Sequence, residues 1–120
     1  MMRSAEAEIE TRRIAPPVFL VLEQAWLVQV TVAHVTGVPL QELCARTRSS
    51  PKAAFARQIA MYLSHTVFTM NLADVARAFG RDRSTAVHAV RLIEELREDS
   101  ELDRMLCWME AMLMRAGRFS

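Results

Sequence analysis

The stretch that decides the fold runs from Asn71 to Arg97 and reads NLADVARAFGRDRSTAVHAVRLIEELR. Its apolar residues recur at i, i+3, i+4 and i+7 from Leu72 to Phe79, which predicts an amphipathic helix. Asn71 is a typical N-cap residue, and Gly80 is the residue type that most often ends a helix. The first half of the stretch is therefore predicted to be a short helix that stops at Gly80.

A second helix is predicted from Ser84 to about Arg97, after the polar turn Arg81-Asp82-Arg83. Asp82 or Ser84 is expected to cap it. The positions expected to face inward are apolar: Ala86, Ala89, Val90, Ile93 and Leu96. Ser84, His88 and Arg91 lie on the opposite stripe, spaced by four and three residues. Two helices joined by a short polar turn form a helix-turn-helix pattern, whose second helix can enter the major groove of DNA.

Four further helices are predicted outward from this stretch. One runs from Pro17 to about Val35 and stops at Gly37, and a short one opens at Pro39. Another starts at Pro51 with Ser50 as its N-cap, and the last covers about Ser100 to Arg115. We therefore expect an all-α fold of about six helices in one compact domain over 17–120, with 1–16 as a flexible segment.

The composition fits a single globular domain, with 120 residues of which 52% are hydrophobic and 24% are charged. The three glycines are isolated from one another, which excludes a glycine-rich phosphate loop. Cys44 and Cys107 form no Cys-x-x-Cys pair, and the sequence has no serine-hydrolase elbow or zinc-protease motif. We expect no catalytic residues, no metal and no cofactor, and we expect a cytoplasmic, nucleoid-associated location.

Charge is distributed unevenly along the chain, although the formal net charge is only +1. Residues 1–42 sum to −2, residues 43–93 sum to +6, and residues 94–120 sum to −3. A basic block between acidic flanks is typical of a surface that binds a polyanion. The alternative is a solvated face without a partner, and charge alone does not distinguish the two.

The residues Arg57–Leu63 (RQIAMYL) and Val75–Val90 (VARAFGRDRSTAVHAV) closely resemble the C-terminal DNA-binding domain of the bacterial replication initiator DnaA. The resemblance covers about residues 40–98, and its most specific part runs from Phe79 to Ala89. It implies a helix-turn-helix domain that binds double-stranded DNA at the short repeats called DnaA boxes.

The resemblance also implies which residues contact DNA. Arg83, Ser84 and Thr85, supported by Asp82, match the major-groove readers, and Arg48 falls near the minor-groove arginine. Arg57 and Gln58 match phosphate-contacting positions. The remaining residues expected at or near the interface are His65, Ala73, Arg81, His88 and Arg91. The two histidines lie far apart in sequence, which argues against a metal site.

The sequence departs from the family in its turn and in its length. Gly80 is followed directly by Arg81, where the family usually has a second glycine, and Arg83 replaces the family's histidine. We therefore expect the preferred DNA site to differ from the usual box. DnaA has an ATPase domain before this region, and residues 1–42 contain nothing that could supply one. The expected function is a sequence-specific regulator of replication initiation or of transcription, without ATPase activity.

The apolar helix predicted over 18–35 leaves a second interpretation open. It is apolar nearly all round, so one face can pack on the domain while the other binds a second copy or a regulatory partner. A central core helix is the alternative. Glu23, Gln24, Gln29 and His34 interrupt the stretch, which argues against a membrane span. The alternative function is a protein-interaction module that binds an initiator or regulator through this helix.

Overall fold

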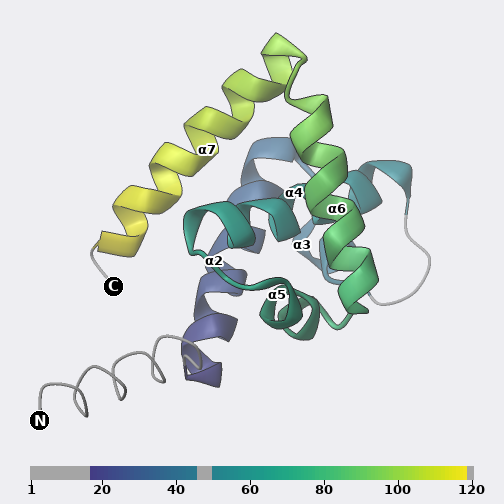
Figure 1. Ribbon diagram of the computed structural model, residues 1–120. Coiled ribbons are helices and arrows are strands. Elements are labelled where there is room, and N and C mark those ends of the chain that lie inside the picture. The colour runs from purple at the N-terminus through teal and green to yellow at the C-terminus, as the bar shows by residue number, and fades with distance from the viewer. Residues whose placement is uncertain (1–16, 46–49, 119–120) are drawn as a thin grey trace, which may run out of the picture.

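The long helix α4 (Pro51–Val67) is the element against which the other helices pack. The computed structural model describes residues 17–45 and 50–118. Within them lie α2 (Val18–Thr36), α3 (Leu40–Leu43), α5 (Leu72–Phe79), α6 (Arg83–Leu96) and α7 (Ser100–Arg118), and no strand (Figure 1). The expected all-α class is confirmed. The predicted flexibility of residues 1–16 concerns residues outside these ranges.

The core forms where α4 meets α2 and α6. Ile59 and Leu63 of α4, Val28 and Val32 of α2, and Ile93 of α6 belong to one cluster and are fully buried. At its N-terminus, α4 is capped by Ser50, whose Oγ accepts a 3.1 Å hydrogen bond from the Ala53 N–H. Removing these apolar surfaces from water is the main source of stability, and it fixes α6 on the domain.

One face of α2 is buried, and the other is exposed. Val21, Ala25, Val28 and Val32 point into the domain. The other face exposes large apolar side chains: Val18, Phe19, Leu22, Trp26 and Val30. Among the described helices, α2 alone is long and apolar enough to cross a membrane by length and composition. Because its inner face packs on α4, α5 and α7, the fold uses it as a packed helix with one face uncovered.

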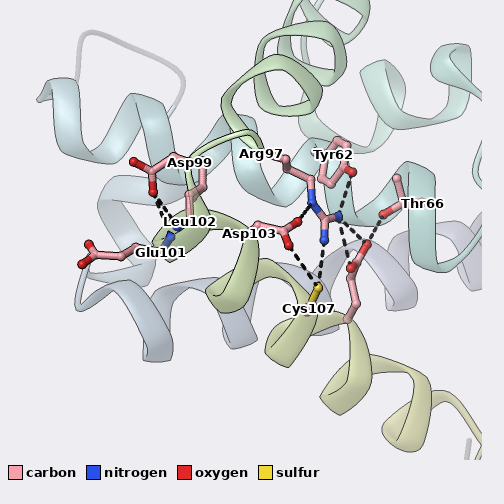
Figure 2. Close-up of polar contacts among 9 residues, drawn as sticks. Tyr62, Thr66, Arg97, Asp99, Glu101, Leu102, Asp103 and Cys107 are labelled. Atoms are coloured by element: carbon pink, nitrogen blue, oxygen red, sulfur yellow. Dashed lines mark hydrogen bonds and ion pairs between the residues drawn. The ribbon is translucent and has the colours of Figure 1, made fainter.

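The corner between α6 and α7 is held by Arg97 (Figure 2). Its Nε donates to Asp103 at 2.6 Å, and its Nη1 donates to the Tyr62 hydroxyl at 2.9 Å and to Glu110 at 3.2 Å. Its Nη2 lies 3.1 Å from the Cys107 sulfur. Burial acts to lower the pKa of Arg97, but hydrogen bonds with Tyr62, Glu110 and Asp103 outweigh burial and raise it. One cation therefore joins α4, the corner and α7.

The last helix, α7, starts at that corner and runs back at an angle to α6, as Figure 1 shows. Leu106, Met109 and Leu113 are fully buried, so the apolar stripe that they form at helical spacing faces the core. The prediction that Leu96 points inward is wrong, since this side chain is 38% exposed. Leu96 is the last residue of α6, and at this end of the helix the elements that cover the inward-facing side end.

Candidate nucleic-acid interface

The turn between α5 and α6 is shaped by Gly80, whose φ of 63° places it in the left-handed region. The Arg81 N–H donates to the Ala76 carbonyl at 2.9 Å, and the Gly80 N–H donates to the Arg77 carbonyl at 3.2 Å. This pair of bonds is a Schellman motif, which satisfies the last carbonyls of a helix. It ends α5 sharply and turns the chain so that α6 can start three residues after Gly80, with α5 and α6 packed together.

The second helix begins at Arg83, one residue before the predicted start. Asp82 occupies the N-cap position, and its backbone carbonyl accepts hydrogen bonds from the Thr85 and Ala86 N–H groups at 3.0 and 3.2 Å. Asp82 therefore takes the expected N-cap position, but α6 has no side-chain cap bond, and Ser84 lies inside the helix. The N-terminus of α6 therefore keeps backbone donors that an anion could use.

The residues of α6 that are expected at the DNA interface share one exposed polar face. Arg83, Ser84, Thr85, His88 and Arg91 are all exposed, and Asp82 beside them is exposed as well. On the opposite side of α6, Ala86, Ala89, Val90 and Ile93 are buried, as the periodicity predicts. Because α6 rests on α4 and α5 through this buried side, it presents the polar side to solvent as a fixed surface.

Two arginines hold the chain directly before the basic stretch 46–49. Arg57 on α4 donates from Nε to the Leu43 carbonyl at 2.9 Å and from Nη2 to the Glu42 carbonyl at 3.1 Å. Arg81 in the turn donates from Nη2 to the Ala45 carbonyl at 2.8 Å. The segment that leads into Arg46 and Arg48 is therefore tied both to α4 and to the helix-turn-helix.

Among the candidate site residues, Arg57 is the one whose burial fits a direct contact with DNA least. The resemblance placed it at a phosphate-contacting position, but the residue is only 8% exposed. Burial lowers the pKa of Arg57, nearby Arg81 lowers it further, and Cys44 acts in the opposite direction. The structure thus gives Arg57 a positioning role at α3, and direct phosphate contact by Arg57 stays a prediction.

The remaining candidates lie along α4 and at its junction with α5. His65 is half-buried, and its Nδ1 lies 2.8 Å from the Met70 carbonyl, so this nitrogen carries the proton. Ala73 is exposed in the first turn of α5, and Gln58 is half-buried on α4. Arg48 lies outside the described residues.

Arg77 is a residue that the sequence reasoning did not select. It is exposed near the end of α5, and its Nη1 lies 3.3 Å from the Asp74 carboxylate. It also lines a hollow of about 450 Å³ with Trp26, Cys44 and Phe79. Its place in the basic 43–93 block was the available signal, although Asp74 offsets part of its charge. Within the described ranges, no group of three or more His, Cys, Asp or Glu side chains could hold a metal ion.

A glycine-ended helix, a tight turn and a second helix with an exposed polar N-terminal face define a DNA-binding helix-turn-helix domain. The family model described as the bacterial DnaA protein helix-turn-helix matches residues 26–93. The chain belongs to this family, and the helix-turn-helix of the family binds DNA in replication initiation.

Individual relatives agree with this assignment. The chromosomal replication initiator protein DnaA of Anaplasma marginale is 36% identical over 74 residues, which are 61% of this chain and 16% of that protein. DnaA 2 of Chlamydia pneumoniae is 40% identical over 77 residues, covering 63% of this chain and 17% of that protein. The chain thus matches about one sixth of the length of these initiators.

Two solved structures share the fold. A DNA replication initiation factor superimposes with a TM-score of 0.73 at 24% identity over 96% of this chain and 37% of its own. The replication initiator DnaA bound to AMPPCP and single-stranded DNA gives 0.69 at 24% identity over 95% of this chain and 37% of its own.

Proposed function

We propose that this chain binds double-stranded DNA at specific sites that resemble DnaA boxes, and that it does so without ATPase activity. By occupying such sites it regulates replication initiation or transcription, in the cytoplasm at the nucleoid. The observation that carries the proposal is the exposed polar face that Arg83, Ser84, Thr85, His88 and Arg91 form between the start and the middle of α6. A major groove about 12 Å wide admits one helix, and the first residues of that helix reach the bases.

The residues on this face of α6 fall into groups according to what they can contact. Arg83 has a two-pronged donor suited to guanine, and a good bidentate contact contributes about 1–3 kcal/mol of discrimination. Ser84 and Thr85 are short, so they let the α6 backbone approach a phosphate. Arg81 and Arg57 hold residues 42–45, the segment that leads into the basic stretch 46–49. We assign reading to Arg83 and positioning of the basic stretch to Arg57 and Arg81.

The first experiment is a selection from random duplexes, followed by titration at several salt concentrations. We expect one enriched motif related to a DnaA box, and an affinity that falls steeply with salt because phosphate contacts release counterions. A steep salt dependence without any enriched motif would reduce the function to non-specific binding.

The second experiment separates the assigned roles. Arg83→Ala should abolish the preference for the selected duplex over others, whereas Arg57→Ala should weaken all duplexes about equally. The matched control is Arg104→Ala on α7, which removes an exposed arginine away from the polar face of α6 and should leave binding unchanged. Circular dichroism of each variant verifies the fold. Equal losses for Arg83→Ala and Arg57→Ala on every sequence would refute the assignment.

A second candidate function is favoured by the uncovered face of α2. Phe19, Leu22 and Trp26 are each at least half exposed along this face. Exposed apolar side chains at helical spacing are typical of a surface that binds another protein or a second copy. Light scattering at increasing concentration tests self-association: Trp26→Ser should abolish any dimer, and a strict monomer would argue against pairing through α2.

A further inference from the structure

We infer that the corner between α6 and α7 binds a protein segment that presents a bulky apolar side chain flanked by lysine or arginine. The site is a hollow of about 470 Å³ at the far end of α6 from Arg83. Four apolar side chains from α4, α6 and α7 line it: Phe55, Leu96, Leu102 and Met105. Asp99 and Glu101 complete its lining and place carboxylates beside the apolar floor.

The segment 94–101, which supplies three of the residues that line the hollow, is strongly negative. Residues 94–101 contain five exposed acids: Glu94, Glu95, Glu98, Asp99 and Glu101. The only basic residue in this segment is Arg97, whose guanidinium is already bonded to Asp103 and Glu110. Arg97 therefore does not offset the five acids, and a ligand of positive charge is the complementary one.

Three of these acids oppose the dipole of their own helix. Glu94 and Glu95 lie in the last turn of α6, and Glu98 follows it, where the backbone already carries partial negative charge. Asp99 has a local explanation, since its Oδ1 accepts hydrogen bonds from the Glu101 and Leu102 N–H groups at 3.0 Å (Figure 2). No such role within the fold accounts for Glu94, Glu95 and Glu98 at that end, and a bound cationic segment would offset their repulsion.

The apolar floor and the open side of the hollow indicate which kind of positively charged ligand fits it. Its floor is apolar, and Leu96 is 38% exposed although it belongs to the inward stripe of α6. An apolar floor offers no ligand atoms to a metal ion, and the carboxylates of the rim would repel a nucleic acid. Since the hollow is open on one side, it suits an inserted side chain of a partner better than an enclosed small molecule.

The test uses the whole chain and a synthetic helical peptide with one leucine face and one lysine and arginine face. Binding is followed by fluorescence anisotropy, and the site is mapped by amide chemical shifts. We expect shifts at Phe55, Leu96, Leu102 and Met105, and weaker binding at higher salt. Matched peptides with serine for leucine, or glutamate for the basic residues, should not bind.

Variants of the hollow make the test decisive. Leu96→Lys should weaken the peptide about tenfold, because it places a like charge on the floor, and Glu101→Gln should weaken it less. Leu96 lies outside the buried core clusters, so the variant should fold, which circular dichroism verifies. The control Glu23→Gln removes an exposed acid of α2 and should bind as the parent does. Shifts confined to α2, or equal affinity of Leu96→Lys, would overturn the proposal.

Discussion

The guanidinium carbon of Arg97 lies 5.8 Å from the centroid of the Tyr62 ring, and Arg97 Nη1 also donates a 2.9 Å hydrogen bond to the hydroxyl of the same tyrosine. Tyr62 is buried on α4, and Arg97 follows the last residue of α6. The same guanidinium reaches Asp103 and Glu110 on α7. The contact therefore fixes the direction in which α7 leaves the end of α6.

Arg97→Gln should lower the free energy of unfolding by about 2 kcal/mol, because it leaves Asp103, Glu110 and the Tyr62 hydroxyl without their cation. For a domain of this size, that loss corresponds to a fall in Tm of about 6–12 °C. Urea denaturation and thermal melting measure both. Arg104→Gln, a change at an exposed position of α7, should stay within about 0.5 kcal/mol of the parent. Equal stability of the two variants would contradict the bridging role of Arg97.

Gly37 ends α2 with a φ of 76°, and a Cβ placed there would meet no atom within 4 Å. Gly37→Ala should therefore cost only the conformational penalty of the left-handed region, about 1 kcal/mol. Gly37→Asn should cost less, because asparagine tolerates this region better. The two variants are compared by urea midpoint at a constant slope. A loss for Gly37→Ala well above this amount would indicate a steric clash that the open surroundings exclude.

Thr69 adopts a φ of 50° in the connection between α4 and α5, although it is β-branched. Its exposed Oγ1 donates to the Phe68 carbonyl at 2.7 Å, which returns little stability because water can replace that bond. Thr69→Asn should raise the free energy of unfolding by about 0.5–1 kcal/mol by relieving the left-handed penalty. A higher urea midpoint is the expected result. A lower one would mean that the Thr69 side chain has a packing role.

Burial raises the pKa of the Cys44 thiol above its ordinary value of 9.0, and Arg57 acts in the opposite direction. A thiol with a higher pKa in the folded state favours folding below pH 9.0, and this contribution is lost as the pH rises through the folded pKa. The free energy of unfolding should therefore fall above about pH 9, and Cys44→Ser should reduce that fall. Chemical denaturation from pH 7 to 10.5 measures the slope. Cys107→Ser is the control, and an unchanged slope in Cys44→Ser would refute this origin.

Local patterns predicted most of the fold. Asn71, Gly80 and Gly37 act at helix ends through their own chemistry, so their positions marked the boundaries of α5 and α2 within one residue. The stripe of α7 was equally legible, because Leu106, Met109 and Leu113 repeat at helical spacing. Leu96 followed the same periodicity yet lies exposed, because burial at a helix end depends on which other element covers it.

The positions that sequence could not predict depend on contacts between distant segments. Arg57 was expected to contact phosphate because it matches a phosphate-contacting position of the family, but it is buried, and the Glu42 and Leu43 carbonyls that it bonds come from α3. Arg97 had no predicted role at all, since its partners Tyr62 and Glu110 lie 35 and 13 residues away. The exposed polar face of α6 was predictable, because it needs only the spacing of Ser84, His88 and Arg91.

Opposite charges at the two ends of α6 have a consequence before any contact is made. Arg81 and Arg83 lie at one end, and Glu94, Glu95 and Glu98 lie at the other. In the field of a polyanion, such a molecule experiences a torque that turns the arginine end forward and the glutamate end away. Much of the orientational search would then be completed during diffusion, and added salt would slow productive encounters even where the final complex is unchanged.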